Sequence, residues 1–449
     1  MKFEIKSFRG GKSDYSDRGI YGSFKQGKNL NIRGSQDVLV CNQALVDDGN
    51  ANAIVTDLIN FFVNSTDGNT YAFGDTGKIY KRTAAAVWSL VYTDSDGEIT
   101  GAAEWYDATK AYLYWTTATK LNRKEIPGAA NWSDVNAGAW QKTNLTSATW
   151  HTMGQANGSL MICNSNKLAM VGYDSSYTNE ALKLRPGITS QALIERGNEV
   201  LVGGGDGVRE SWLSTWEQTS LSWIDKNRIP SKSINAIVQA EVMLMSCGDN
   251  ELFYSDMVNN IPVCTLDGKA NPGGVVENGG LALFGLFGGS SSGLWSYGRN
   301  KKNESHTLNL DHYLDADEVG AICKIAGQVF ISYQKSTTHA IKKVDTATKA
   351  VAEYYSLDLT APKESTWMNV ELLTETIPTG CSIALYYDLD NTGSWTQAKM
   401  AGDIATATAG MRDPIFLVGS YGRTMNVKIV LTPSVNVSPE ISLITINLE

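Results

Sequence analysis

Two aspartate-rich turns contain side chains that could bind a metal ion. Asp388, Asp390 and Asn391 stand in the order that begins a calcium-binding loop, in which alternate oxygens surround a hard cation. Such a loop needs a glutamate at its twelfth position, where this chain has Lys399. Residues 94–98 repeat the pattern with the same defect. We therefore predict a hairpin turn after Asp388, with calcium binding as the alternative.

The densest group of other ligand types surrounds two histidines. His306 and His312 lie close in sequence to three aspartates, which are Asp311, Asp315 and Asp317. Imidazole and carboxylate groups bind transition metals, but six residues of strand span about 20 Å, too far for both imidazoles to reach one ion. We therefore predict a solvated loop and no metal.

The six cysteines are far apart and include no Cys-x-x-Cys pair. Some lie inside apolar runs, as Cys163 does after Met161 and Ile162, so we predict buried free thiols and no disulfide framework. The first residues lack the apolar core of a secretory signal, and no run is long enough to cross a bilayer. These features predict a soluble protein made in a cytoplasm, without membrane insertion.

Three further patterns could indicate ligand binding or catalysis. Residues 203–207 have the glycines of a phosphate loop without the lysine-serine pair, which favours a flexible hairpin. The turn that ends at residues 393–395 is similar to the Asp-box of sialidase-like propellers, but its spacing differs by one residue, and no arginine cluster of a glycosidase is evident. Tryptophans such as Trp212 and Trp216 could stack on sugars, but we assign most of them to packing. We expect no enzyme activity and no cofactor.

A faint internal repeat of about 40 to 50 residues must position all of these residues. Each copy has an apolar run, a Gly/Asn/Asp turn and a second apolar strand. The clear copies begin at Gly101, His151, Gln191, Asn235 and Gly320, and weaker copies begin near Val55 and Leu281. The count predicts a β-propeller of about seven blades, and the alternative is a large sandwich or two stacked β domains.

The composition agrees with an all-β fold, because glycine is abundant, proline is scarce and no long segment has helical periodicity. We predict an extended N-terminal arm at residues 1–45, a β-propeller at 46–362 and a small C-terminal β-sandwich at 366–449. The sandwich is predicted from about six short strands with alternating apolar residues. The boundary is placed at the polar, proline-bearing residues 361–365.

Charge is distributed unevenly along the chain. The net charge of −9 argues against broad coating of nucleic acid, but the first thirty-odd residues are basic. We take six cations of this segment as candidate subunit-docking residues: Arg9, Lys12, Arg18, Lys25, Lys28 and Arg33. They predict an arm that lies along an acidic neighbouring subunit or near DNA, with an attraction that salt weakens. The alternative is a leader that packs on its own propeller.

The same segment resembles a known family. Its sequences FRGGKSDY (8–15), GIYGSFKQGKNLNIR (19–33) and CNQAL (41–45) are similar to the leader of structural proteins of tailed bacteriophages. The resemblance is specific over the first tenth of the chain and includes no catalytic motif. It implies a propeller protein of the tail, related in role to the nozzle or hub proteins of short-tailed phages. Such proteins form a ring of identical subunits around the channel through which the genome passes.

We therefore expect a non-enzymatic virion component, a nozzle- or hub-like ring subunit that contributes to the DNA-ejection channel and to tail assembly. The expected partners are other copies of itself, neighbouring tail or connector proteins and, transiently, genomic DNA. Net acidity on the lumen would repel DNA and keep it from adhering during passage. The alternative function is a glycan-binding or glycan-cleaving propeller for recognition of the host surface.

Overall fold

The computed structural model describes residues 1–34, 36–49, 56–83, 86–156, 158–197, 199–217, 222–256, 258–289, 292–299 and 301–449. These residues form β-strands, turns and loops, and no helix occurs among them. The chain divides into two compact units. The first contains residues 1–46, 293–314 and 344–449, and the second contains residues 47–292 and 315–343. The prediction of an all-β fold is confirmed.

Seven small antiparallel sheets follow one another along the chain. The first sheet contains β6 (Ile59–Asn64), β7 (Thr70–Gly74), β8 (Lys78–Arg82) and β9 (Trp88–Thr93), and the second contains β10 (Gly101–Tyr106), β11 (Ala111–Thr116) and β12 (Leu121–Ile126). The third contains β13 (Met153–Ala156), β14 (Ser159–Asn164), β15 (Lys167–Gly172) and β16 (Tyr177–Lys183), the fourth β17 (Thr189–Arg196), β18 (Glu199–Gly205), β19 (Ser211–Glu217) and β20 (Ser222–Ile229), and the fifth β21 (Ile234–Gln239), β22 (Met243–Cys247), β23 (Glu251–Ser255) and β24 (Asn260–Thr265). The sixth contains β25 (Val275–Asn278), β26 (Leu281–Gly285), β27 (Gly293–Gly298) and β28 (Thr307–Tyr313), and the seventh contains β29 (Glu318–Ile325), β30 (Gln328–Lys335) and β31 (Thr338–Lys349), with β5 (Gln43–Asp47) at its edge.

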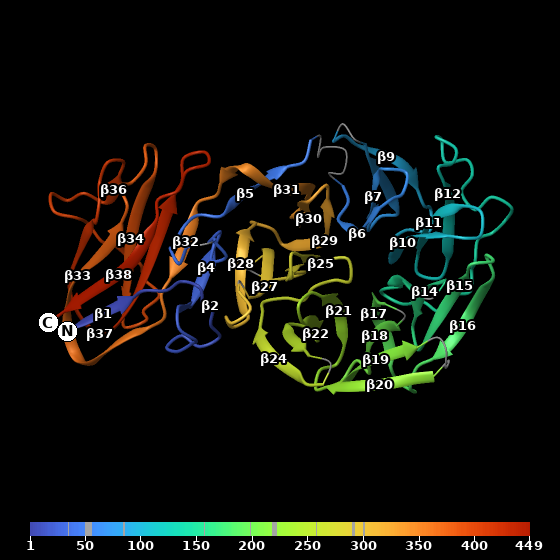
Figure 1. The fold of residues 1–449 in the computed structure, drawn as a ribbon, viewed down its shortest axis with the longest axis horizontal. Coiled ribbons are helices and arrows are strands. Elements are labelled where there is room, and N and C mark those ends of the chain that lie inside the picture. The colour runs from blue at the N-terminus through green and yellow to red at the C-terminus, as the bar shows by residue number, and fades with distance from the viewer. Residues whose placement is uncertain are drawn as a thin grey trace. The chain divides into compact units, whose positions relative to one another are not determined.

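The first strands of these sheets form a closed ring. In order around the ring, β6, β10, β13, β17, β21, β25 and β29 each contact the next, and β29 contacts β6 again. All seven belong to the second unit, and Figure 1 shows them around a common centre. Seven sheets whose first strands surround one axis are a seven-bladed β-propeller. The blade number predicted from the repeat is confirmed.

Apolar side chains hold neighbouring blades together. Between the third and fourth blades, Met161 and Cys163 are buried against Val200 and Trp216. Burial raises the pKa of the Cys163 thiol to about 12, so this cysteine acts as a small apolar residue. All six cysteines are free, as predicted, and all but Cys264 are buried.

The sequence repeat coincides with the innermost strands. The five clear copies correspond to β10, β13, β17, β21 and β29. The copy near Val55 starts outside the described residues, and the first strand after it begins at Ile59. The copy at Leu281 is one strand out of phase, because Leu281 begins β26, whereas the innermost strand of that blade is β25.

The predicted flexible hairpin at residues 203–207 is wrong for its first three glycines. Gly203, Gly204 and Gly205 end strand β18 and are buried. A Cβ atom on Gly205 would lie 2.1 Å from the backbone oxygen of Lys232 in the next connection. The glycines therefore allow close approach of the backbone, and the turn begins only at Asp206.

A buried carboxylate, Asp48, joins the first and last blades beside β5. Its Oδ2 accepts hydrogen bonds from Arg82 Nε at 2.6 Å and from Trp88 Nε1 at 2.8 Å. Its Oδ1 lies 3.0 Å from Arg82 Nη2 and 3.4 Å from Lys343 Nζ. Because Arg82 and Trp88 belong to the first blade and Lys343 to the last, Asp48 fastens the ring at its closure.

The second blade has three strands, and residues 127–150 follow β12 where the other blades continue with a fourth strand or its equivalent. Two tryptophans of this insertion are buried. Trp132 stacks on Tyr92 with ring centroids 5.7 Å apart, and Trp140 packs edge-on against Tyr114 at 5.3 Å. The prediction that these aromatic residues serve packing is confirmed for both.

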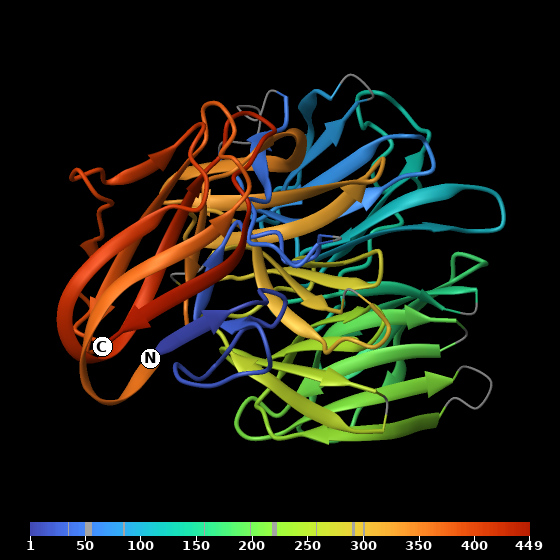
Figure 2. The same cartoon turned by 60° about the vertical axis from the view of Figure 1, so that its left-hand side comes forward.

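The first unit contains a nine-stranded sheet. Its strands are β1 (Lys2–Ile5), β38 (Ile441–Leu448), β33 (Leu359–Thr374), β37 (Ile415–Thr432), β32 (Ala352–Tyr355) and β4 (Gln26–Lys28), with β34 (Ser382–Leu389), β35 (Thr396–Gln397) and β36 (Thr406–Thr408) joined to β37 through β34. Strand β1 pairs with β38, so the two chain termini lie side by side (Figures 1 and 2). The short strands β2 (Gly11–Lys12) and β3 (Ser23–Phe24) form a separate parallel pair.

The structure differs from the predicted division of the chain. The N-terminal segment is packed into the first unit, because Phe8, Phe24 and Leu30 are buried in the same core as Trp367. The predicted linker at residues 361–365 lies inside the long strand β33, at a shift of its register with β37. Hydrogen bonds also join the C-terminal strands into one sheet with β1 and β4, whereas the sequence predicted a separate small sandwich.

Candidate functional site

Two of the six candidate docking cations pack within the first unit. Arg33 donates to Ser296 Oγ at 3.1 Å, to the Gly298 oxygen at 3.2 Å and to the Thr307 oxygen at 2.9 Å, and burial lowers its pKa. Arg9 forms an ion pair with Glu304 at 3.1 Å. These contacts are intramolecular, so the expectation that Arg33 and Arg9 face a partner is not met.

The other four cations lie nearer to solvent. Lys25 pairs with Asp358 at 3.4 Å and Lys28 with Glu353 at 3.5 Å, both within the first unit. Lys12 pairs with Asp14 at 3.4 Å. The guanidinium carbon of Arg18 lies 4.1 Å from the centroid of the Tyr15 ring. The structure thus brings Lys12 and Arg18 to one segment and distributes the rest among local ion pairs.

Arg18 lies in a loop, residues 13–22, which directly follows Lys12 and which we name the docking loop. Its ends are fixed by backbone hydrogen bonds from Gly10 N to the Gly22 oxygen at 3.0 Å and from Ser13 N to the Phe24 oxygen at 2.8 Å. Inside it, Ser13 Oγ donates to the Arg18 oxygen at 2.6 Å. A Cβ on Gly10 would lie 2.2 Å from Ser23 N, so only glycine allows the two ends to meet.

The docking loop exposes large side chains. Tyr15, Ile20 and Tyr21 are 56%, 48% and 76% exposed. Beside them a groove of about 180 Å³ is lined by Ile5, Ile20, Tyr21, Leu357 and Leu359, with Glu4 and Lys6 at its edge. Sequence reasoning selected the cations and missed these residues. Aromatic side chains in a turn-rich segment without strand periodicity were the available signal.

Charge at the groove is locally balanced. Glu4 lies 2.5 Å from Lys2 Nζ and 2.5 Å from Lys6 Nζ. Hydrogen bonds from these two lysines lower the pKa of Glu4 to about 2. The groove therefore offers apolar surface next to a compact group of charges, a composition that occurs at protein–protein interfaces.

The propeller has a cavity of its own at the centre of the ring. It has a volume of about 400 Å³ and is lined by the innermost strands, with apolar side chains such as Phe61, Met153, Leu193, Ile237 and Ile322. Its lining also includes two glutamates, Glu195 and Glu277. The volume of this cavity lies within the usual range of small-ligand sites.

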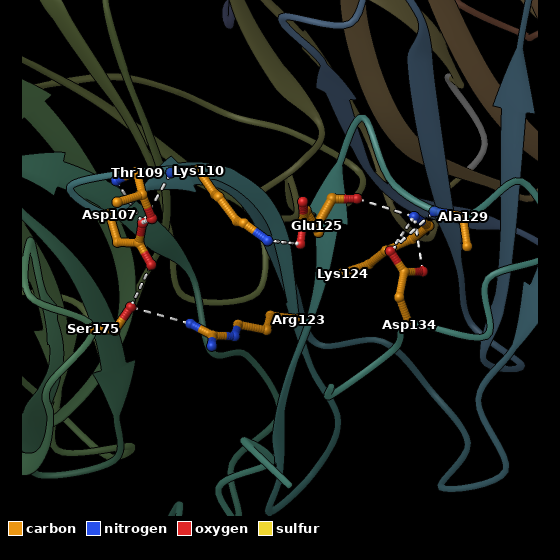
Figure 3. Close-up of polar contacts among 9 residues, drawn as sticks. All are labelled: Asp107, Thr109, Lys110, Arg123, Lys124, Glu125, Ala129, Asp134 and Ser175. Atoms are coloured by element: carbon orange, nitrogen blue, oxygen red, sulfur yellow. Dashed lines mark hydrogen bonds and ion pairs between the residues drawn. The ribbon is translucent and has the colours of Figure 1, made fainter. Parts of the chain in front are cut away.

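A polar network connects the second and third blades at their rim (Figure 3). Ser175 Oγ donates to Asp107 Oδ2 at 2.7 Å and lies 3.2 Å from Arg123 Nη1. Burial alone would raise the pKa of Asp107, but hydrogen bonds from Ser175 and from the backbone N–H groups of Thr109 and Lys110 lower it to about 2. The guanidinium of Arg123 also lies between the rings of Tyr112 and Trp140, at 4.2 and 4.3 Å from their centroids.

This network fixes the insertion of the second blade. Lys124 Nζ contacts Asp134 Oδ1 at 3.1 Å, and Ala129 N donates to Asp134 Oδ2 at 3.1 Å (Figure 3). Lys110 pairs with Glu125 at 2.6 Å. Lys110 and Lys124 have partners of opposite sign, Asp107 accepts several hydrogen bonds, and Arg123 contacts Ser175 and two aromatic rings, so the contacts serve to position residues 127–150.

The residues with metal-ligand chemistry are used in other ways. Asp388 accepts hydrogen bonds from Thr392 N at 3.1 Å and Gly393 N at 2.9 Å, in the predicted turn. His312 lies in β28 rather than in a solvated loop; it is buried, and its Nδ1 lies 2.8 Å from the Gln43 oxygen. The sequence misplaced it because a run of polar residues precedes β28. Within the described ranges, no group of three or more His, Cys, Asp or Glu side chains could hold a metal ion. Nor do these ranges contain a helix that could span a bilayer.

Comparison with known proteins gives likeness in structure alone. No family model matches the chain, and no curated protein matches its sequence. The extracellular domain of BT4673 from B. thetaiotaomicron has 13% identity and a TM-score of 0.49 over 84% of this chain, which spans only 48% of that domain. The WD40 propeller domain of Doa1 has 11% identity and a TM-score of 0.49, covering 67% of this chain and 97% of that domain. The RRP9 WD40 repeats have 13% identity and a TM-score of 0.48, with 67% of this chain and all of that chain covered.

Proposed function

We propose that this protein is a structural subunit of a bacteriophage tail. In this proposal identical copies form a ring around the tail axis, and each copy attaches to a neighbouring tail or connector protein through the docking loop. The subunit acts as a scaffold in the virion and performs no catalysis. The resemblance of residues 8–15, 19–33 and 41–45 to leaders of phage structural proteins motivates the proposal.

The single observation that carries the proposal is the exposed, internally braced docking loop. Large side chains that remain in solvent are costly unless they meet a partner, and a preorganised loop loses little conformational entropy on binding. Tyr15, Arg18 and Tyr21 supply the residue types that dominate binding energy at interfaces. The backbone bonds at Gly10 and Ser13 fix the ends of the loop that carries these side chains.

The small size of the propeller cavity favours a DNA channel formed between several copies over a channel that passes through one copy. The cavity measures about 400 Å³ and is lined by residues of the innermost strands. A DNA duplex, whose major groove alone is about 12 Å wide, needs a far larger passage. A channel for the genome would therefore require several subunits around an axis, as cyclic assemblies provide.

The experiment is a mass measurement of the purified protein in solution. We expect a closed oligomer, or a stable complex with a copurified tail protein, that weakens when Arg18 and Tyr21 are both changed to alanine. Val351→Ala, an exposed apolar residue of the same unit outside the loop, is the matched control and should leave assembly unchanged. A monomer that binds glycan with micromolar affinity, or that hydrolyses it, would contradict the proposal.

A further inference from the structure

The seven innermost strands share a two-residue pattern at one end. In each strand an apolar residue that lines the cavity is followed two positions later by a polar residue on the same face of the strand. The pairs are Phe62 and Asn64, Ala102 and Glu104, Met153 and Gln155, Leu193 and Glu195, Ile237 and Gln239, Val275 and Glu277, and Ile322 and Lys324. We name the seven polar residues the channel rim.

Hydrogen bonds between blades order part of the rim. Asn64 Nδ2 donates to the Lys324 oxygen at 2.8 Å, from the first blade to the last. Gln155 Nε2 donates to the Glu104 oxygen at 2.7 Å. Glu195 in turn accepts a hydrogen bond from the Gln155 backbone N–H. Rim residues therefore lie beside one another where the last blade meets the first, the second meets the third and the third meets the fourth.

The rim carries a net negative charge. It carries three glutamates and one lysine, and the other three positions are amides. Among the described residues that line the cavity, Glu195 and Glu277 are the ionisable ones, and both side chains are exposed. Carboxylates at the mouth of a cavity attract a cation and disfavour an anion.

We propose that this cavity binds a small organic cation. Its apolar body lies against Met153, Leu193, Ile237 and neighbouring side chains, and its amine or guanidinium meets the carboxylates of Glu195 and Glu277. The volume of about 400 Å³ lies within the usual range for small-ligand sites. We expect the site to discriminate ligands by charge, because neutral or anionic molecules with the same apolar body have no electrostatic attraction to the carboxylates at the rim. The site lies within one propeller, so it does not depend on the proposed tail assembly.

The test is titration of the intact protein at low ionic strength with three probes of equal length: hexylamine, hexanol and hexanoate. We expect hexylammonium to bind with a Kd of about 1 mM, as its few heavy atoms allow, and hexanoate at least about tenfold more weakly. Glu195→Gln combined with Glu277→Gln should weaken hexylammonium binding about tenfold. Glutamine retains the acceptor oxygens for Gln155 N and Gly280 N, so these exposed changes leave the strands intact.

The matched control removes the same charge elsewhere on the propeller. Glu180→Gln with Asp249→Asn changes two exposed carboxylates outside the cavity lining, and hexylammonium affinity should stay within about twofold of the original protein. Equal affinity for hexanol and hexylammonium, unchanged binding in the rim variant, or no detectable hexylammonium binding would each overturn the proposal.

Discussion

At the residue scale, closure of the propeller depends on Asp48. Its side chain is fully buried and has three partners, Arg82, Trp88 and Lys343. Burial alone would raise the pKa of Asp48, but hydrogen bonds from Arg82 and Trp88 and the charge of Arg82 lower it overall. We predict that Asp48→Asn reduces the free energy of unfolding by about 3 kcal/mol, because Arg82 then remains half-buried without its counter-charge. Urea denaturation measures this change.

The pH dependence of this effect has a definite sign. Because the folded-state pKa of Asp48 lies below its unfolded value, its stabilisation is present above the unfolded pKa and is lost as the pH falls through the folded pKa. The difference between Asp48→Asn and the original protein should therefore shrink in acid. Asp249→Asn, which removes an exposed ion pair with Lys232, is the control and should change stability by less than about 1 kcal/mol. A difference that stays constant down to pH 2 would refute the role of the charge.

A second residue-scale prediction concerns Asp75, whose pKa is raised by burial and by the charge of Asp57. Its carboxylate is favoured in the protonated form, so its stability contribution is complete below the unfolded pKa and is lost as the pH rises through the folded pKa. We predict that Asp75→Asn raises the apparent melting temperature at pH 7 by about 2 °C and has no effect at about pH 3, below the unfolded pKa of 3.8. Asparagine retains the acceptor for Leu58 N, which lies 3.2 Å from Asp75 Oδ1. Thermal melts at both pH values measure this effect. A lower melting temperature for Asp75→Asn than for the original protein at pH 7 would contradict the prediction.

At the element scale, close packing of consecutive blades depends on glycine. A Cβ at Gly205 would approach the Lys232 oxygen to 2.1 Å, a backbone atom that cannot move alone. We predict that Gly205→Ala destabilises the protein by about 2 kcal/mol or more, measured by urea denaturation. Gly34→Ala is the control, because the nearest atom to its Cβ would be 3.8 Å away. Equal stability of the two variants would show that the strands can separate without cost.

The sequence predicted those elements whose local pattern agrees with their packing. Strands β10, β13, β17, β21 and β29 were found because each is an apolar run followed by a turn and a second strand. Blade closure was not predictable in this way, because β5 and Asp48 meet β31 and Lys343 across almost 300 residues. The role of the N-terminal segment was predicted from its cations. Its position is instead determined by Phe8 and Phe24, which are buried in the core of the first unit.

The candidate sites were also only partly predictable from the sequence. The channel rim is visible in the sequence only after the innermost strands are aligned, since no single glutamate of the set is unusual. The basic, turn-rich character of residues 9–33 was visible in the sequence, but Arg9 and Arg33 were assigned to a partner and instead bind backbone and side-chain groups of their own chain. Intramolecular acceptors for an arginine depend on tertiary structure, which composition does not reveal.

At the scale of the whole molecule, the two units suggest different roles. The second unit contains the closed ring of innermost strands, in which each strand contacts two neighbours, whereas β27 and β28 of the sixth blade belong to the first unit. The first unit carries the docking loop and both chain termini. We therefore assign rigidity and the cation-binding cavity to the propeller, and attachment to the first unit. The main prediction for the whole molecule therefore concerns the assembly of several copies.

Electron cryo-microscopy of the assembled protein, purified or within the virion, tests that claim most directly. The account predicts a closed ring of identical copies with density from a neighbouring protein against Tyr15, Arg18 and Tyr21. It also predicts a lumen bounded by several copies. Isolated monomers at micromolar concentrations with no neighbour in the virion, or a ring in which residues 13–22 face empty solvent, would contradict it.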